Sequence, residues 1–181
     1  MAHPQSSSSA PLVLVAGGTG HLGARVVRTL LARGCRVRVL ARPRAASRTR
    51  AADLQALGPH DAFEVVEADL ARGDADGALA GACRGADAVC SCAGASVDLH
   101  ALGDRQTFAR VDRDGNLALL AAARAARVGR FVYVGVHDGS RSYRDTAYVA
   151  AHEAVAEALA AGPLPHAVVR STGLFWFFGE V

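Results

Sequence analysis

Residues 12–23 of this chain read Leu12-Val13-Leu14-Val15-Ala16-Gly17-Gly18-Thr19-Gly20-His21-Leu22-Gly23. A continuous apolar run that ends in glycine is typical of a parallel strand covered on both faces. After it, Gly17 can take a tight turn, Gly20 lets the backbone approach a pyrophosphate, and Gly23 lets a following helix pack closely on the strand. The N–H groups and the positive dipole end at the start of that helix would face the phosphates. We therefore predict a dinucleotide site at Gly17, Thr19, Gly20, His21, Leu22 and Gly23. The alternative, a glycine turn without a ligand, is disfavoured by the strand–helix alternation that follows.

That alternation of strand and helix continues along the rest of the chain. Apolar runs predict strands at 12–16, 35–41, 62–68, 86–93, 130–136 and 166–170. Helices are expected at 21–33, 47–57, 77–82, 105–127 and 146–161, with glycine or Gly-Pro at their ends. Right-handed crossovers between the strands then predict an α/β fold, a doubly wound parallel sheet of the Rossmann type with the order 3-2-1-4-5-6. A ligand crevice is expected at the carboxyl ends of strands one and four.

Composition limits the classes to which the chain can belong. Its 181 residues suit one domain at 11–181, preceded by a flexible tail at 1–10. The 51% hydrophobic and 20% charged content is that of a globular protein. A net charge of +3, with arginines interleaved among acidic residues, gives little support to nucleic-acid binding. No stretch resembles a signal peptide or a membrane span, so we expect a cytoplasmic protein without membrane partners.

The lysine and cysteine content of the chain excludes several kinds of catalytic and metal site. All 20 basic residues are arginine, so no lysine amine is available for a Schiff base or for assisting acid catalysis. The four cysteines, Cys35, Cys83, Cys90 and Cys92, match neither a zinc-ligand spacing nor a Cys-x-x-Cys motif, so we expect no metal site. Cys90 and Cys92 are two apart in an apolar strand and should point to the same face. Buried free thiols are the favoured interpretation.

The end of the predicted second strand indicates which dinucleotide is bound. An acidic residue there would hold the ribose hydroxyls of NAD, but no carboxylate occurs between Arg42 and Asp53. Four arginines fall within nine residues instead, at Arg42, Arg44, Arg48 and Arg50. Because arginine suits bidentate phosphate recognition, we predict NADP (NADPH) rather than NAD, with Arg42 as the main contact. The alternative is compositional, since arginine carries all the basic charge of the chain.

Two further segments are expected beside the cofactor. Asp69 and Leu70 close the third predicted strand, and Asp69 could accept a hydrogen bond from the adenine amino group or could cap the following turn. Ala93 and Gly94, at the end of the fourth strand, are small where a cofactor would pass close to the backbone.

Taken together, these segments resemble the short-chain dehydrogenase/reductase superfamily, and within it the NmrA-like NAD(P)-binding proteins. The resemblance is carried by 17–23, Arg42, Asp69-Leu70, Arg130-Phe131-Val132-Tyr133-Val134, Val111-Asp112 through Gly115-Asn116, and Arg170-Ser171-Thr172-Gly173-Leu174-Phe175. It covers residues 11–181 and implies an NAD(P)-binding Rossmann domain. Members usually continue for roughly another hundred residues that build the substrate pocket, so we expect that part to be largely absent.

The resemblance also implies where catalysis would occur. Reductases of this superfamily use a Ser, a Tyr and a Lys, the last two spaced as Tyr-x-x-x-Lys on one helix face, where the cation favours the tyrosinate. The tyrosine exchanges a proton while hydride moves to or from the nicotinamide. Here Tyr148 is followed by His152 at the lysine position, and Gly135 stands near the serine position. We name Tyr148 and His152 as catalytic candidates, with a neutral imidazole as the weaker partner. The alternative is that both are ordinary residues of a first helical turn.

Three functions remain open at this point. The first is an NADPH-dependent oxidoreductase with a degenerate active site. The second is a non-catalytic NADP(H)-binding redox sensor, for which NmrA-like proteins give a precedent by resemblance. The third is a truncated remnant domain, suggested by the apolar cluster of Phe175, Trp176, Phe177 and Phe178, which could also support self-association.

Overall fold

The computed structural model describes residues 10–56, 60–95, 107–137 and 146–171. The aromatic cluster at 175–178 lies outside these residues. None of the described helices is long and apolar enough to cross a membrane.

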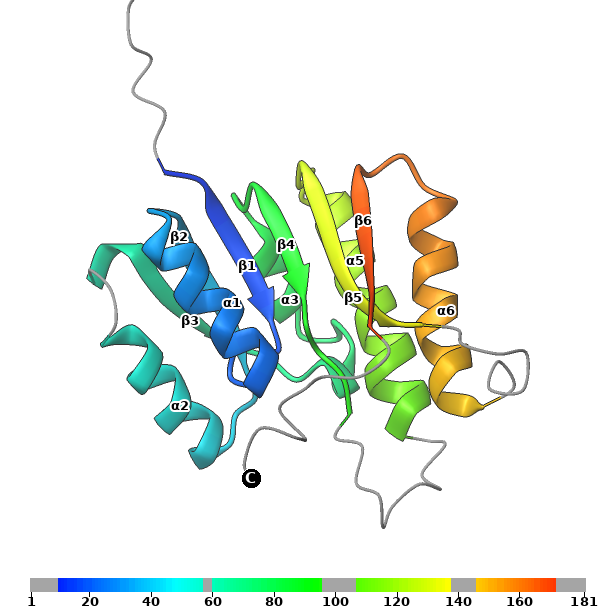
Figure 1. Ribbon diagram of the computed structural model, residues 1–181, viewed down its shortest axis with the longest axis horizontal. Coiled ribbons are helices and arrows are strands. Elements are labelled where there is room, and N and C mark those ends of the chain that lie inside the picture. Colours follow the sequence, from blue (N-terminus) through cyan, green and yellow to red (C-terminus); the bar gives the residue numbers. More distant parts are fainter. Residues whose placement is uncertain (1–9, 57–59, 96–106, 138–145, 172–181) are drawn as a thin grey trace, which may run out of the picture.

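One parallel sheet forms the centre of the molecule, with the order β3-β2-β1-β4-β5-β6 (Figure 1). Its strands are β1 (Leu12–Ala16), β2 (Arg36–Ala41), β3 (Phe63–Glu67), β4 (Ala88–Ser91), β5 (Arg130–Val136) and β6 (His166–Ser171). The predicted fold class and strand order are confirmed. Because the strands are parallel, the carboxyl ends of β1 and β4 lie at the same edge of the sheet. The order of the strands reverses between these two, and a parallel α/β sheet offers its ligand crevice at such a point.

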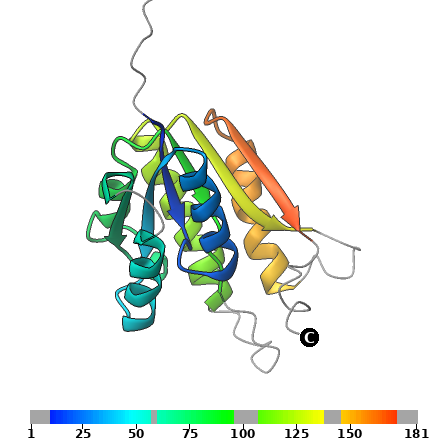
Figure 2. The same ribbon diagram turned by 60° about the vertical axis from the view of Figure 1, so that its left-hand side comes forward.

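Helices lie on both faces of the sheet (Figures 1 and 2). One face carries α1 (His21–Ala32) and α2 (Ala45–Gln55), and the other carries α3 (Ala78–Cys83), α5 (Asn116–Ala125) and α6 (Ala147–Ala160). Two short 3-10 turns, η1 (His60–Ala62) and η2 (Leu70–Arg72), flank β3. Most predicted element boundaries differ from these by one or two residues.

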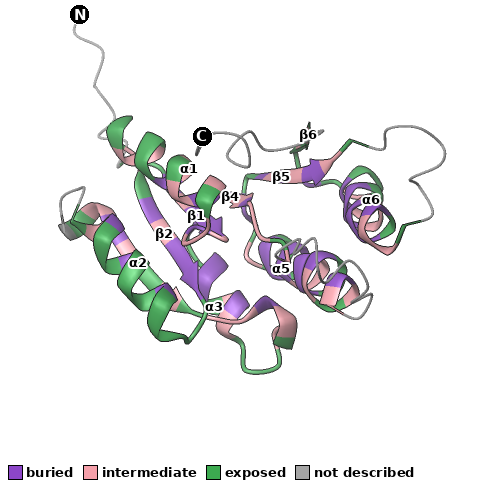
Figure 3. Ribbon diagram, turned by 60° about the horizontal axis from the view of Figure 1, so that its bottom comes forward, coloured by how far each residue is buried: buried purple, intermediate pink, exposed green. Residues whose placement is uncertain are grey.

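Alternation along the strands divides the core into two apolar clusters. Leu14 of β1 faces the larger cluster, which includes residues of α3, α5 and α6, whereas Val15 faces the smaller one beneath α1 and α2. Both side chains are fully buried, as expected for a strand covered on both faces. Figure 3 shows this burial in the central strands and on the helix faces turned toward the sheet.

The cover on the α1 face does not extend over the whole sheet. Val37 and Val39 of β2 are fully buried there, but no described helix lies over β5 and β6 on that side (Figure 1). The register aligns Val134 of β5 with Val169 of β6, and Val169 is 52% exposed. Among the described residues, the β5 and β6 part of this sheet face therefore lacks a helical cover.

One predicted helix is wrong in form. The sequence favoured a single helix over 105–127, of which residues 105 and 106 lie outside the described residues. In the described part, η3 (Phe108–Gly115) is a π-helix, and the α-helix α5 follows it. Gly115 packs so closely on η2 that a Cβ there would lie 2.6 Å from the carbonyl oxygen of Leu70. The Asn116 side chain also donates to the carbonyls of Val111 and Asp112, at 3.2 and 3.1 Å. A side chain that occupies backbone acceptors widens the helical turn, and such π segments are frequent at functional sites.

Candidate functional site

The glycine turn has the backbone geometry that a phosphate site needs. Gly17 has a φ of +74°, and a Cβ there would lie 2.7 Å from the carbonyl oxygen of Cys92. A Cβ on Gly23 would lie 2.1 Å from the carbonyl oxygen of Gly17, so this glycine lets α1 pack against the turn. Gly20 donates its N–H to Gly17 at 2.9 Å, and a Cβ on Gly20 would meet only that oxygen, at 3.2 Å, among the described atoms within 4 Å. The outer side of the turn therefore has room for a ligand.

The start of α1 is suited to an anion. Gly20 is its N-cap and supplies no side-chain hydrogen bond, and the first turn contains no acidic residue. In contrast, Thr146 caps α6 by accepting a hydrogen bond from the Val149 N–H at 3.3 Å. A helix start without a side-chain cap presents backbone donors and a positive dipole end to a phosphate. This end of the sheet therefore fits a pyrophosphate.

The arginines that follow β2 differ in their contacts, and only some of them have a charged partner among the described residues. Arg48 forms an ion pair with Glu67, with Nε and Oε1 2.5 Å apart, so its charge is balanced. The pKa of Arg48 is raised by that hydrogen bond and by the charge of Glu67. Arg50 donates to the carbonyl oxygen of Thr19 at 3.3 Å and so lies beside the glycine turn. Arg42 follows β2 directly and is exposed.

The other predicted cofactor contacts are found at the same edge of the sheet. Asp69 accepts a hydrogen bond from the Ala71 N–H at 3.1 Å, which is the capping role left open above, while its adenine contact stays a prediction. Leu70 is buried in the larger core cluster. Ala93 and Gly94 follow β4, and a Cβ on Gly94 would come within 3.0 Å of Asp112 Oδ1. His21 and Leu22 begin α1.

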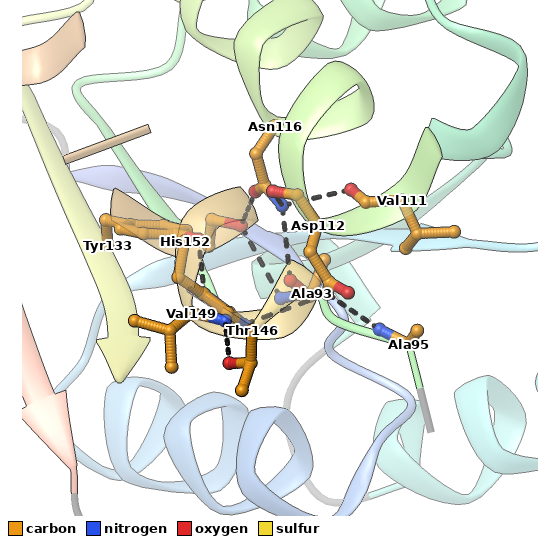
Figure 4. Close-up of polar contacts among 10 residues, drawn as sticks. Ala93, Ala95, Val111, Asp112, Asn116, Tyr133, Thr146, Val149 and His152 are labelled. Carbon is orange, nitrogen blue, oxygen red and sulfur yellow. Dashed lines mark hydrogen bonds and ion pairs between the residues drawn. The ribbon is translucent and has the colours of Figure 1, made fainter. Parts of the chain in front are cut away.

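Behind this edge lies a buried polar network that centres on Asn116 (Figure 4). Its Oδ1 accepts from the Ser91 hydroxyl at 2.5 Å, and its Nδ2 donates to the carbonyl of Ala93 at 3.3 Å in addition to its two η3 contacts. Ser91 and Asn116 are fully buried. The network ties the end of β4 to η3, and so holds Ala93 and Gly94 in place.

The same network contains two ionisable groups that face one another. Asp112 is fully buried; its Oδ1 accepts from the Ala95 N–H at 2.8 Å and lies 3.9 Å from His152 Nε2. Asp112 Oδ2 and His152 Nε2 have no hydrogen-bond partner among the described residues. Burial raises the pKa of Asp112 to about 6, against the lowering effect of the Ala95 N–H. Burial lowers the pKa of His152 to about 4, so this imidazole is neutral at neutral pH.

Tyr148 and His152 come together as the spacing predicted, but without the expected geometry. Their rings meet edge to face with centroids 4.8 Å apart. The hydrogen bond of His152 Nδ1 is with the Tyr133 hydroxyl of β5, at 2.6 Å. Burial, with a further effect of Asp112, raises the pKa of Tyr148. The surroundings therefore keep Tyr148 protonated. The described residues that contact it or affect its pKa, namely His152, Phe108 and Asp112, include no cation at neutral pH.

Sequence reasoning did not name Asp112, Asn116 or Tyr133 as site residues. Asp112 and Asn116 are four residues apart in a predicted helix whose other inward positions are apolar, and this spacing was the available signal. No such local signal exists for Tyr133, because its partner lies 19 residues away on another element.

Comparison with known proteins agrees with this geometry. Residues 17–178 match the family described as NAD(P)H-binding. The chain belongs to this family. No curated protein sequence matches it.

Solved structures show the same fold. A putative NAD-dependent epimerase/dehydratase from Bacillus halodurans is 20% identical with a TM-score of 0.72, over 89% of this chain and 70% of that one. A short-chain type dehydrogenase/reductase from Mycobacterium ulcerans is 25% identical with a TM-score of 0.65, over 83% of this chain and 61% of that one. The complex of AtPrR2 with NADP+ and (+)pinoresinol is 23% identical with a TM-score of 0.70, over 94% of this chain and 52% of that one. The NAD(P)H-binding chain thus spans between 52% and 70% of the length of these three structures.

Proposed function

We propose that this NAD(P)H-binding domain binds NADP(H) in preference to NAD(H). The observation that carries the proposal is the Arg50 guanidinium, which lies against Thr19 of the glycine turn while no carboxylate follows β2 before Asp53. A 2′-phosphate beside this turn would meet Arg42 and Arg50, whereas the hydroxyl of NAD would find no acidic partner. The carboxylate of Glu67 would not repel a bound phosphate strongly, because its ion pair with Arg48 neutralises its charge.

Calorimetric titration with NADPH and NADH tests this proposal. Arg42→Ala and Arg50→Ala should each weaken NADPH binding by roughly ten- to a hundredfold and leave NADH binding nearly unchanged, since a charged hydrogen bond contributes about 1.5–3 kcal/mol. Arg33→Ala is the matched control, because it removes the same charge at the far end of α1. Equal affinity of the parent protein for NADPH and NADH would contradict the preference, and no binding of either would contradict the cofactor site.

A second candidate function is an NADPH-dependent reduction in which Tyr148 is the catalytic acid. The cofactor would supply hydride, and the raised pKa of Tyr148 keeps the hydroxyl able to donate a proton to a carbonyl oxygen. However, the neutral His152 bonds to Tyr133 and gives a Tyr148 anion little support. Binding without turnover, as in a sensor, is therefore the stronger form of the proposal.

Tyr148→Phe separates these two candidates. A reductase should oxidise NADPH with a carbonyl or enone substrate, and the variant should abolish this while it keeps NADPH affinity. A binding protein should show no turnover in either form, with equal affinities.

A further inference from the structure

Two thiols lie together at the end of β4. Cys90 Sγ and Cys92 Sγ are 3.9 Å apart. The Cys92 N–H donates to the Ala16 carbonyl at 2.9 Å, so strand pairing with β1 extends to Cys92 and explains why both side chains share a face. A disulfide bond of about 2.05 Å would need the sulfurs to close by roughly 2 Å.

The backbone at Cys92 packs directly against Gly17 and so forms one side, here called the wall, of the glycine turn. The Cys92 carbonyl oxygen and the Ala93 nitrogen lie 2.7 and 2.8 Å from the point that a Cβ on Gly17 would occupy. Alternate Cα atoms of a strand are about 6.6 Å apart, near the upper limit of about 6.8 Å for a disulfide. Closing the bond would therefore pull on this wall and displace it relative to Gly17.

The position of the pair gives small reagents access to it. Both thiols are half-buried, whereas Cys83 is fully buried. Cys90 aligns with the buried Val15 on one side and with the half-buried Val132 on the other, so it stands where the α1 cover ends. The hydrogen bond with Cys92 lowers the pKa of Cys90, which favours Cys90 as the attacking thiolate.

We propose that Cys90 and Cys92 form a reversible dithiol–disulfide site whose closure weakens NADP(H) binding at the adjoining turn. The second half of this statement rests on the proposed function. The oxidant is a peroxide such as hydrogen peroxide: the Cys90 sulfur attacks one oxygen, the O–O bond breaks, and a sulfenic acid and one water form. The Cys92 sulfur then attacks the sulfenic sulfur, the S–S bond forms, and the hydroxyl leaves as a second water with the remaining thiol proton. A thiol reductant reverses the step by exchange, aided by the strain of so short a loop.

Peptide mass spectrometry and NADPH titration on the same samples test the proposal. After hydrogen peroxide treatment, the peptide that holds both cysteines should lose two hydrogen atoms, and dithiothreitol should restore them. The Kd for NADPH should rise by about fivefold or more on oxidation, and by linkage bound NADPH should disfavour oxidation by the same factor. Cys92→Ser should abolish both responses to peroxide, and Cys35→Ser, which removes a half-buried thiol elsewhere, should keep both.

The outcomes separate the two parts of the proposal. Sulfinic or sulfonic acid at Cys90 without an internal disulfide would overturn the dithiol site. A disulfide that leaves the Kd for NADPH unchanged would overturn the coupling. If the reduced protein binds no NADPH, the proposed function fails, but the mass spectra still decide whether the dithiol site exists.

Discussion

Replacement of Gly23 by alanine tests whether the glycine turn and α1 are packed as tightly as the structure indicates. A Cβ on Gly23 would lie 2.1 Å from the Gly17 oxygen and 2.7 Å from the Gly17 carbonyl carbon. Ordinary contacts begin near 3.4 Å, so α1 would have to move by roughly 1 Å, and no side chain can rotate out of the way. Overpacking of this kind costs about 3 kcal/mol, from which the better helix propensity of alanine subtracts about 1 kcal/mol. We expect Gly23→Ala to lower the free energy of unfolding by about 2 kcal/mol.

Gly81→Ala in α3 is the matched control, because a Cβ there meets nothing within 4 Å. The free energy of unfolding of this variant should rise by about 1 kcal/mol, because alanine has the better helix propensity. The free energies of unfolding of the two variants, measured in urea, should therefore differ by about 3 kcal/mol. Gly23→Ala should also lose NADPH binding, since any movement of α1 displaces its N-terminal donors. If the two variants were equally stable, the close contact between α1 and the turn would be refuted.

Three further changes probe the buried network behind the site. The raised folded pKa of Asp112, about 6 against an ordinary 3.8, means that its contribution to stability is full below pH 4 and lost as the pH rises through 6. The free energy of unfolding of Asp112→Asn, compared with that of the parent, should therefore rise by up to about 3 kcal/mol between pH 4 and pH 8. Urea midpoints at the two pH values measure this, and a difference that does not depend on pH would contradict it. The lowered pKa of His152 acts in the opposite direction: its contribution is full above pH 6.5 and lost as the pH falls through about 4. His152→Gln should make acid unfolding less steep, and an unchanged acid limb would show that His152 is not the group that is charged on unfolding. Asn116→Ala should cost about 3 kcal/mol, because it leaves the Ser91 hydroxyl and buried carbonyls without their partner; a loss below about 1 kcal/mol in urea unfolding would argue against the network.

The fold could be predicted well because it depends on short sequence patterns, an apolar strand followed by a helix, that recur along the chain. Residues 12–23 identify the first strand and turn, and the alternation with right-handed crossovers leaves few other strand orders. The π-helix escaped prediction because the local bonds of Asn116 to Val111 and Asp112 form in a setting that distant segments create. Leu70 packs on Gly115, and the Ala93 carbonyl accepts from Asn116. Helical spacing brought Tyr148 beside His152, but it could not reveal that Tyr133 takes the imidazole hydrogen bond. Which cofactor is bound and whether Tyr148 acts in catalysis stay predictions.

In the described part of the chain, no helix covers β5 and β6 on the α1 face, and this has a consequence for how the molecule opens. Backbone amides in β1 and β2, enclosed by helices on both sides, should exchange with deuterium only when the whole domain unfolds. Amides of β6 border solvent on the α1 side, where Val169 is 52% exposed, and among the described strands β6 pairs with β5 alone. A small local separation of β6 from β5 would suffice to expose them. The protein should therefore exchange as a gradient across the sheet, with its slowest amides beneath the glycine turn and its fastest strand amides at the β6 edge.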